Sequence, residues 1–352
     1  MCSNSDSRRV CIRRDDKGPG GLLLLQEAKT LISSHFLHPT ANIVNARRDK
    51  NSGISFCHAG LPNAGLGNKL LVWAKAMVFA RINDLPLVVT GWTTFQLAPI
   101  LQGRDLRLYW NYFRRVKEVN WFRRVTIRRR ARIVDDPPLS RVEGPSQPTI
   151  YTFRRLSHWS DYFGDLKPHR ELVRDALFSM LTPARRRELE RLPKAKVCIQ
   201  VRMGDFFILK PGQDFAKVGG TRTPLAYFVK MIEGIREIHG SQLPVTILSD
   251  GSRDQLRELL AIPAVELGSR QTAIVDIFRM ARGRVLIPSA GSTFGYWGGF
   301  LGDCAMIMHP DHIHKSIRPD SVNERYYEGP ALGPPQQWPE LLQQNIRAIG
   351  AV

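Results

Sequence analysis

An apolar run that ends abruptly in charged residues is the strongest constraint on how this chain folds. Residues 197–201 have the sequence Val-Cys-Ile-Gln-Val, and Arg202 and Asp205 follow closely. A short apolar run of this kind predicts a buried strand. In an open α/β sheet, ligands bind at the carboxyl ends of the strands, which is where Arg202 and Asp205 would lie. A fixed cation at that position suits a phosphate group.

A second segment supports an anion site. Residues 284–288 predict another strand, a small polar turn follows from Ser289 to Thr293, and Phe294 begins a helix rich in glycine and aromatic residues. Backbone N–H groups in such a turn, together with the positive end of the helix dipole, favour an anion. Both segments therefore predict binding of negative charge.

The wider pattern of strands and helices predicts an α/β protein. A strand, a glycine-bearing turn, a helix and a strand over residues 54–90 open a predicted parallel sheet, and regular alternation resumes after Pro193. The predicted elements there are strands at 197–201, 245–249, 285–288 and 305–308, and helices at 224–239, 253–260, 272–281 and from 293. We therefore divide the chain into an appendage at 1–52, α/β domains at 53–193 and 194–328, and a Pro-rich tail with a short helix at 329–352.

The chain carries a net charge of +19, and residues 104–132 hold much of this excess. Aromatic residues are interleaved with the cations of this segment: Tyr109, Trp110, Tyr112, Phe113, Trp121 and Phe122. This pattern is typical of a segment that settles on an anionic membrane surface. Nucleic acid is the competing partner, and a solvated charged face of a basic protein is the third interpretation.

Membrane-spanning, disulfide-linked and metal-binding classes are not favoured. No apolar stretch approaches the roughly 20 residues that span a bilayer, and we identify no signal peptide. The 5 cysteines are widely spaced without a C-x-x-C pair, which argues against a disulfide framework and a zinc site. We interpret His309, His312 and His314 as a solvated loop. The expectation is a cytoplasmic protein, peripheral at the inner face of the membrane, with no metal.

The order of four motifs resembles the fucosyltransferase superfamily of the GT-B fold, most closely the α-1,2-fucosyltransferase family. That family has a Gly-Gly-Leu-Gly-Asn turn, a strand that ends in His-x-Arg-Arg-Gly-Asp, a Ser-Asp pair, and a Ser-Thr-Phe or Ser-Ser-Phe helix start followed by Trp. Segments 64–68, 200–205, 249–250 and 292–297 match these in order, and 158–163 resembles the family's aromatic segment. Two departures stand out: Gln200 replaces the histidine, and Met203 replaces the second arginine.

The resemblance implies two Rossmann-like domains that face a cleft, with the acceptor on the side of the first and a GDP-sugar on the second. It implies inverting, metal-independent transfer of fucose or a related deoxyhexose from GDP-fucose or a similar donor to a glycan hydroxyl. An α-1,2 linkage on an envelope or lipid-linked glycan is expected, with no cofactor.

The resemblance also assigns roles to residues. Arg202 is expected to bind the diphosphate in a bidentate geometry. Asp205 is expected to align the donor, to accept the acceptor proton or to brace Arg202. The other expected positions are Asp276 and Gln200 at guanine, Ser249 and Asp250 in the nucleotide region, Ser292, Thr293 and Phe294 at the diphosphate, Asn68 reaching in from the first domain, and Trp159 and Tyr162 on the acceptor side.

Two other classes of function stay open at this point. Gln200 and Met203 keep open a catalytically degenerate protein that only binds glycan. The clustered arginines and aromatic residues keep open a basic nucleic-acid-binding protein without catalysis, whose affinity would fall steeply with salt.

Overall fold

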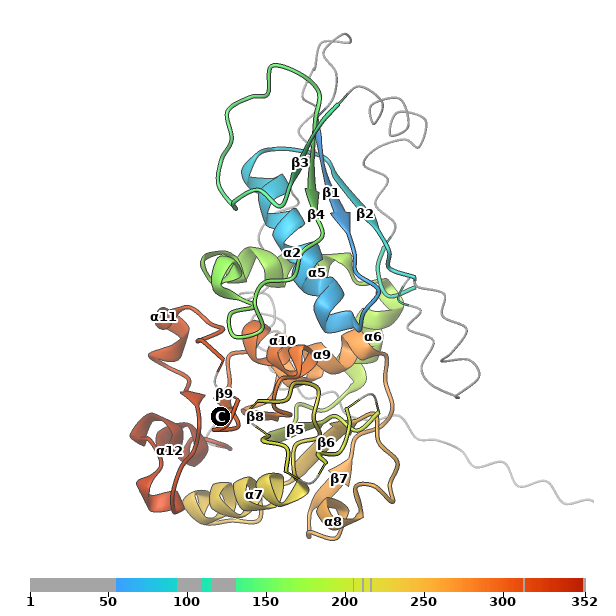
Figure 1. Ribbon diagram of the computed structural model, residues 1–352. Helices are drawn as coiled ribbons and strands as arrows, with labels where there is room; N and C mark the ends of the chain where they lie inside the picture. Colours follow the sequence, from blue (N-terminus) through green and yellow to red (C-terminus); the bar gives the residue numbers. More distant parts are fainter. Residues whose placement is uncertain are drawn as a thin grey trace, which may run out of the picture. The chain divides into compact units, whose positions relative to one another are not determined.

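A computed structural model describes residues 55–93, 109, 111–114, 131–204, 206–210, 212–215, 217–312 and 314–350 (Figure 1). Three sequence predictions lie outside these residues: the appendage at 1–52, most of the basic segment at 104–132, and the position of Asp205. Within the described residues, no helix is long and apolar enough to cross a membrane.

The first sheet contains four parallel strands in the order β2-β1-β4-β3. These are β1 (Phe56–Gly60), β2 (Leu87–Thr90), β3 (Arg132–Asp135) and β4 (Thr149–Phe153). Helix α2 (Leu66–Ile82) connects β1 to β2, which confirms the predicted opening of the sheet. Buried residues occupy every face of α2, as expected of a helix that is covered on all sides.

The second sheet contains six parallel strands in the order β10-β9-β8-β5-β6-β7. The strands are β5 (Val197–Val201), β6 (Val245–Ser249), β7 (Val265–Leu267), β8 (Val285–Pro288), β9 (Ala305–Ile307) and β10 (Glu328–Gly329). Helices α7 (Leu225–His239), α8 (Arg257–Leu260), α9 (Ala273–Ala281) and α10 (Thr293–Leu301) lie between them in the chain. The predicted α/β class with parallel sheets is therefore confirmed.

Shorter elements complete the chain. Between the sheets lie the 3₁₀-helix η1 (Gly164–His169), α5 (Arg170–Met180) and α6 (Pro183–Arg191). After β9 come α11 (Asp320–Asn323), the 3₁₀-helix η2 (Pro335–Gln337) and α12 (Glu340–Arg347). Because β10 pairs with β9 and α12 packs on α7, the segment after residue 328 is part of the second sheet's packing. The boundaries at 193 and 328 stay predictions.

Helices cover both faces of the second sheet, so its central strand is buried throughout. Val197, Ile199 and Val201 of β5 share a core with α7 and α12, whereas Cys198 shares a core with α9 and α10. This alternation follows from the two-residue repeat of a strand. It explains why the sequence of β5 is a nearly continuous apolar run.

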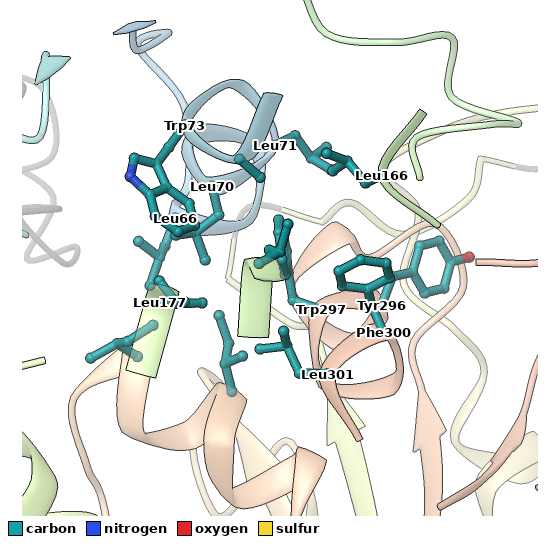
Figure 2. Close-up of a cluster of buried hydrophobic side chains, with 14 of the residues drawn as sticks. Leu66, Leu70, Leu71, Trp73, Leu166, Leu177, Tyr296, Trp297, Phe300 and Leu301 are labelled. Atoms are coloured by element: carbon teal, nitrogen blue, oxygen red, sulfur yellow. The ribbon is translucent and has the colours of Figure 1, made fainter. Parts of the chain in front are cut away.

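Helices α2 and α10 pack together in the larger core (Figure 2). Leu66, Leu70 and Leu71 of α2 lie beside Trp297 and Leu301 of α10, with Leu166 and Leu177 alongside. The Nε1–H of Trp297 donates a 2.8 Å hydrogen bond to the carbonyl oxygen of Gly67. The two predicted glycine-bearing helix starts are therefore in direct contact.

Arginines cap several helices, so part of the positive charge serves the fold. The last carbonyls of a helix lack internal partners and favour a cation. The bonds are Arg170 Nε to Phe300 O of α10 at 2.6 Å, Arg186 Nη2 to Ser179 O of α5 at 2.7 Å, and Arg282 Nη1 to Leu189 O of α6 at 2.8 Å.

The interpretation of His309, His312 and His314 as a solvated loop is wrong. His312 and His314 are only 8% and 7% exposed. His314 Nδ1–H donates to the carbonyl oxygen of Lys315, and its Nε2 accepts the N–H of Tyr162 at 2.9 Å. Burial lowers the pKa of His314 and lowers that of His309 to about 4. All three histidines are hydrogen-bonded packing residues, and the lowered pKa values favour the neutral form of His309 and His314.

Candidate functional site

The candidate site lies at the carboxyl ends of β5 and β8. The chain passes from β5 through β6 to β7 on one side, and then returns to β8 on the other side of β5. At such a switch point the loops after two neighbouring strands diverge, which opens a crevice for a ligand. The two anion-binding segments predicted from the sequence follow these two strands. The sheet therefore brings them together.

Ser289 joins the two strand ends. Its N–H donates to the carbonyl oxygen of Gln200 at 2.8 Å, and its Oγ accepts the N–H of Arg202 at 2.9 Å. The Ser289 hydroxyl also donates to the carbonyl oxygen of Gln200 at 3.0 Å. Ser289 is fully buried, so this bonding fixes the backbone from which the Arg202 side chain extends. Sequence reasoning included Ser289 only as part of a polar turn.

Asp250 braces Arg202. Its Oδ2 lies 2.7 Å from Nη1 of Arg202, and its Oδ1 accepts the N–H of Met203 at 2.8 Å. Both side chains are partly exposed, at 24% for Arg202 and 32% for Asp250. The guanidinium carbon of Arg202 also lies 5.4 Å from the centre of the Phe206 ring. The Asp250 carboxylate thus holds both the Arg202 guanidinium and the backbone of the next residue, Met203.

Two glycines allow the loops after β5 and β6 to approach each other. A Cβ at Gly204 would lie 2.7 Å from Oδ2 of Asp250, and one at Gly251 would lie 2.8 Å from Cγ of Met203. Met203 is 5% exposed and belongs to the apolar core on the α7 side. A charged side chain at this position would be costly to bury. An apolar methionine therefore suits this position.

The start of α10 is built by a network of buried hydroxyls. Ser292 caps the helix, and its Oγ accepts the N–H of Gly295 at 3.4 Å. The N–H of Gly291 donates to the Tyr296 hydroxyl, and that of Ala290 donates to Oγ1 of Thr223, both at 2.9 Å. The first N–H groups of a helix have no acceptor within the helix. Those of Thr293 and Phe294 are the donors that would meet an anion.

Gly67 brings the first glycine turn against this helix start. A Cβ at Gly67 would lie 2.6 Å from Oγ1 of Thr293 and 2.9 Å from the backbone nitrogen of Phe294. The neighbouring Asn68 has a buried Oδ1 with no hydrogen-bond partner among the described residues. Because buried polar atoms are nearly always bonded, an unsatisfied acceptor here points to a missing donor.

Gln200 and Ser249 support the strand ends from within. Gln200 is only 2% exposed, and its Oε1 accepts the N–H of Ser289 at 3.3 Å. A Cβ at Gly295 would lie 2.7 Å from that same Oε1, so the amide lies directly under α10. The Oγ of Ser249 accepts the N–H of Gly251 at 2.9 Å and closes the turn that carries Asp250. Direct contact of either residue with a nucleotide stays a prediction.

Asp276, which is partly buried, and Arg279, which is buried, are polar residues on one face of α9. Burial raises the pKa of Asp276 to about 7, although the nearby Arg279 acts in the opposite direction. Arg279 is 4% exposed, and a Cβ at Gly268 would lie 2.7 Å from its Nη1. Among the described residues, Asp276 Oδ1 and Arg279 Nε and Nη1 have no hydrogen-bond partner. Sequence reasoning identified Asp276 but missed Arg279, whose signal was the three-residue helical spacing.

Trp159 lies at the surface, whereas Tyr162 contacts His314, whose ring centroid is 5.3 Å from that of Tyr296 in α10. Trp159 is 54% exposed. Tyr162 stacks on His314, with 5.6 Å between ring centroids, and its N–H is bonded to the same histidine. No contact that the structure describes joins either residue to Arg202. Their assignment to an acceptor stays a prediction, as does every role of Asp205.

No group of three or more His, Cys, Asp or Glu side chains in the described part of the chain is arranged to hold a metal ion. Two features at this edge of the sheet suit an anion: the Arg202 guanidinium after β5, which pairs with Asp250 after β6, and the helix start at Thr293 after β8. Together they form a site that can bind an anion through fixed hydrogen-bond donors.

No protein-family model matches the sequence, and no curated protein matches it either. Solved structures with a related arrangement include fucosyltransferase NodZ from Bradyrhizobium, with 14% identity, a TM-score of 0.46, and coverage of 74% of this chain and 97% of that one. A mutant of Arabidopsis thaliana FUT1 in complex with GDP has 14% identity, a TM-score of 0.42 and coverage of 86% and 80%. POFUT1 in complex with GDP has 12% identity, a TM-score of 0.43 and coverage of 76% and 98%.

Proposed function

We propose that this protein is an inverting, metal-independent glycosyltransferase. It moves fucose or a related deoxyhexose from a GDP-sugar to a glycan hydroxyl, with an α-1,2 linkage on an envelope or lipid-linked glycan. The observation that carries the proposal is the Arg202 guanidinium, held by Asp250 at the carboxyl end of β5, next to the strand β8 that leads into α10. The order of the four sequence motifs is the reason for proposing a sugar nucleotide as the anion that binds there.

The departing diphosphate is the group that the site serves in this proposal. The acceptor oxygen attacks the anomeric carbon, the bond from that carbon to the diphosphate oxygen breaks, and negative charge accumulates on the diphosphate. Arg202 and the N–H groups of Thr293 and Phe294 stabilise that charge. Preorganised donors of this kind each contribute roughly 3–4 kcal/mol to the transition state. The acceptor hydroxyl loses a proton in the same step, and Asp205 is the carboxylate that we propose receives it.

The nucleotide base is assigned to the Asp276 and Arg279 pair. An ionised carboxylate accepts two hydrogen bonds from the N–H groups of guanine, whereas a guanidinium donates to its carbonyl oxygen O6 and ring nitrogen N7. The unsatisfied atoms of both side chains supply these functions. Gln200 stays assigned to the guanine end, and Asn68 Oδ1 offers an acceptor from the first glycine turn.

A calorimetric titration with GDP at physiological salt in the presence of EDTA tests the proposal. The parent protein is expected to bind one GDP, Arg202→Ala to lose binding, and Arg202→Lys to retain only a small part of it, because lysine cannot form the bidentate pair. Arg191→Ala is the matched control, since Arg191 is an exposed arginine at the end of α6.

Each alternative predicts a different result. Binding that Arg202→Ala leaves unchanged would remove the phosphate role of Arg202. Binding of nucleic acid without binding of GDP would instead favour the basic nucleic-acid-binding interpretation. GDP binding without sugar transfer to any glycan would indicate a degenerate transferase.

A further inference from the structure

An exposed apolar run follows the candidate site directly. Phe206, Phe207, Ile208 and Leu209 are consecutive, and the exposed fractions of Phe207 and Ile208 are 45% and 71%. Phe206 is half-buried beneath the guanidinium of Arg202. Contiguous exposed apolar residues rimmed by polar groups mark a contact surface. We call Phe207 and Ile208 the apolar tip.

The apolar tip is held in a defined position relative to Arg202. The N–H of Phe207 donates to the carbonyl oxygen of Gly220 at 3.0 Å, and its own carbonyl oxygen accepts the N–H of Arg222 at 2.9 Å. The Nε of Arg222 donates to the carbonyl oxygens of Met203 and Phe206, at 3.0 and 2.9 Å. Because this backbone is already ordered, binding through the tip costs little further conformational entropy.

Two lysines follow the apolar tip in the sequence. Lys210 is exposed, and the Lys217 side chain is 82% exposed, 3.3 Å from the carboxylate of Asp214. The chain as a whole carries a net charge of +19. Apolar side chains next to lysines match the chemistry of an anionic membrane interface, where the apolar groups enter the acyl boundary and the cations meet phosphates.

We propose that Phe207 and Ile208 dock this protein on an anionic phospholipid bilayer, with the Arg202 site at the membrane surface. The inference deepens the proposed function, on which it rests for the idea of a lipid-linked acceptor. Docking by two apolar side chains and a few lysines is reversible, so the enzyme binds the surface without being anchored in it. The short connection from the tip to Arg202 then brings the acceptor's headgroup region to the donor site.

Sedimentation with lipid vesicles tests the docking. Vesicles of phosphatidylcholine mixed with phosphatidylglycerol are compared with vesicles of phosphatidylcholine alone. We expect the full chain to bind the mixed vesicles, and binding to weaken as salt rises. The Phe207→Ser/Ile208→Ser double variant is expected to bind the mixed vesicles at least about tenfold more weakly than the parent. The matched control is Ile133→Ser/Leu332→Ser, which removes two apolar residues that are 53% and 58% exposed elsewhere.

Several outcomes would overturn the docking proposal. Equal binding of the parent and the double variant would assign membrane contact to another segment, and absence of parent binding would remove it altogether. A parent that is dimeric without lipid, and monomeric once the tip is replaced, would make the tip a self-association surface. If the double variant does not fold, the Ile208→Trp variant provides a second test. Brominated lipid is expected to quench the fluorescence that the new tryptophan adds to that of the parent, and lack of this quenching would contradict the proposal.

GDP titration of the same variants separates this inference from the proposed function. The double variant is expected to bind GDP as the parent does, because the apolar tip lies outside the donor site. Vesicle binding without GDP binding would contradict the proposed transferase function and support the docking surface. GDP binding without vesicle binding would support the transferase function and contradict the docking surface.

Discussion

The ion pair between Arg202 and Asp250, with 2.7 Å between Nη1 and Oδ2, is a direct product of sheet register. Val201 of β5 pairs with Ser249 of β6, so the next residue of each strand falls at the same level. Arg202 and Asp250 therefore meet just beyond Val201 and Ser249, the last paired residues of the two strands. The carboxylate restricts the rotamers of the guanidinium, which prepares Arg202 to meet a ligand at little entropic cost.

Replacing Asp250 should weaken binding of the nucleotide without unfolding the protein. Asp250→Ala removes both the partner of Arg202 and the acceptor of the Met203 N–H. Loss of the groups that orient metal ligands typically costs 10–100-fold, and by analogy we expect a loss of about that size in GDP affinity. Calorimetry measures it, with the exposed Asp254→Ala as control. Unchanged affinity would show that Arg202 does not depend on this brace.

Gly67→Ala should destabilise the packing of α2 on α10. The added Cβ would lie 2.6 Å from Thr293 Oγ1 and 2.9 Å from the Phe294 nitrogen, and one of these contacts is with backbone. Overpacking of this kind costs about 1–3 kcal/mol. Gly65→Ala is the matched control, because a Cβ at Gly65 meets nothing within 4 Å. Urea denaturation of both variants measures the difference, and equal stabilities would contradict the close approach.

Asp276→Asn should alter how stability depends on pH. The folded-state pKa of Asp276 is about 7, above its ordinary value of 3.8, so the folded protein holds a proton that the unfolded chain releases in this range. Ionisation of Asp276 therefore weakens the parent as pH rises toward 7. We expect the variant's stability relative to the parent to increase by about 2–3 kcal/mol between roughly pH 5 and pH 8.

His309 makes the comparison with the parent necessary. Its folded-state pKa of about 4 lies below the ordinary value of 6.5, so its contribution is lost as pH falls through that range. The two groups thus act in opposite directions over nearly the same pH window. Because parent and variant share His309, its contribution cancels in the difference between their free energies of unfolding. A difference that does not vary with pH would show that Asp276 is not buried as described.

The central strands could be predicted because their signal is local. β5 and β8 are short apolar runs bounded by polar turns, and burial on both faces requires such a run wherever the strand is placed. Strands β3, β4, β7 and β10 were not predicted, although β4 is buried throughout. β7 and β10 contain only 3 and 2 residues, and β3 has mostly exposed side chains. Their strand character comes from pairing with neighbours rather than from their own composition.

The sequence by itself determined the parallel α/β class and the helix start at Ser292, because periodicity and turn chemistry are carried by neighbouring residues, and it singled out Arg202 and Asp276 as candidate site residues. Only the tertiary structure decided that Asp250 holds Arg202, that Met203 is buried, that Gly67 touches Thr293, and that His312 and His314 lie inside. These features depend on strand register and on packing between distant segments. Such contacts form only when the chain closes on itself, and no local pattern encodes them.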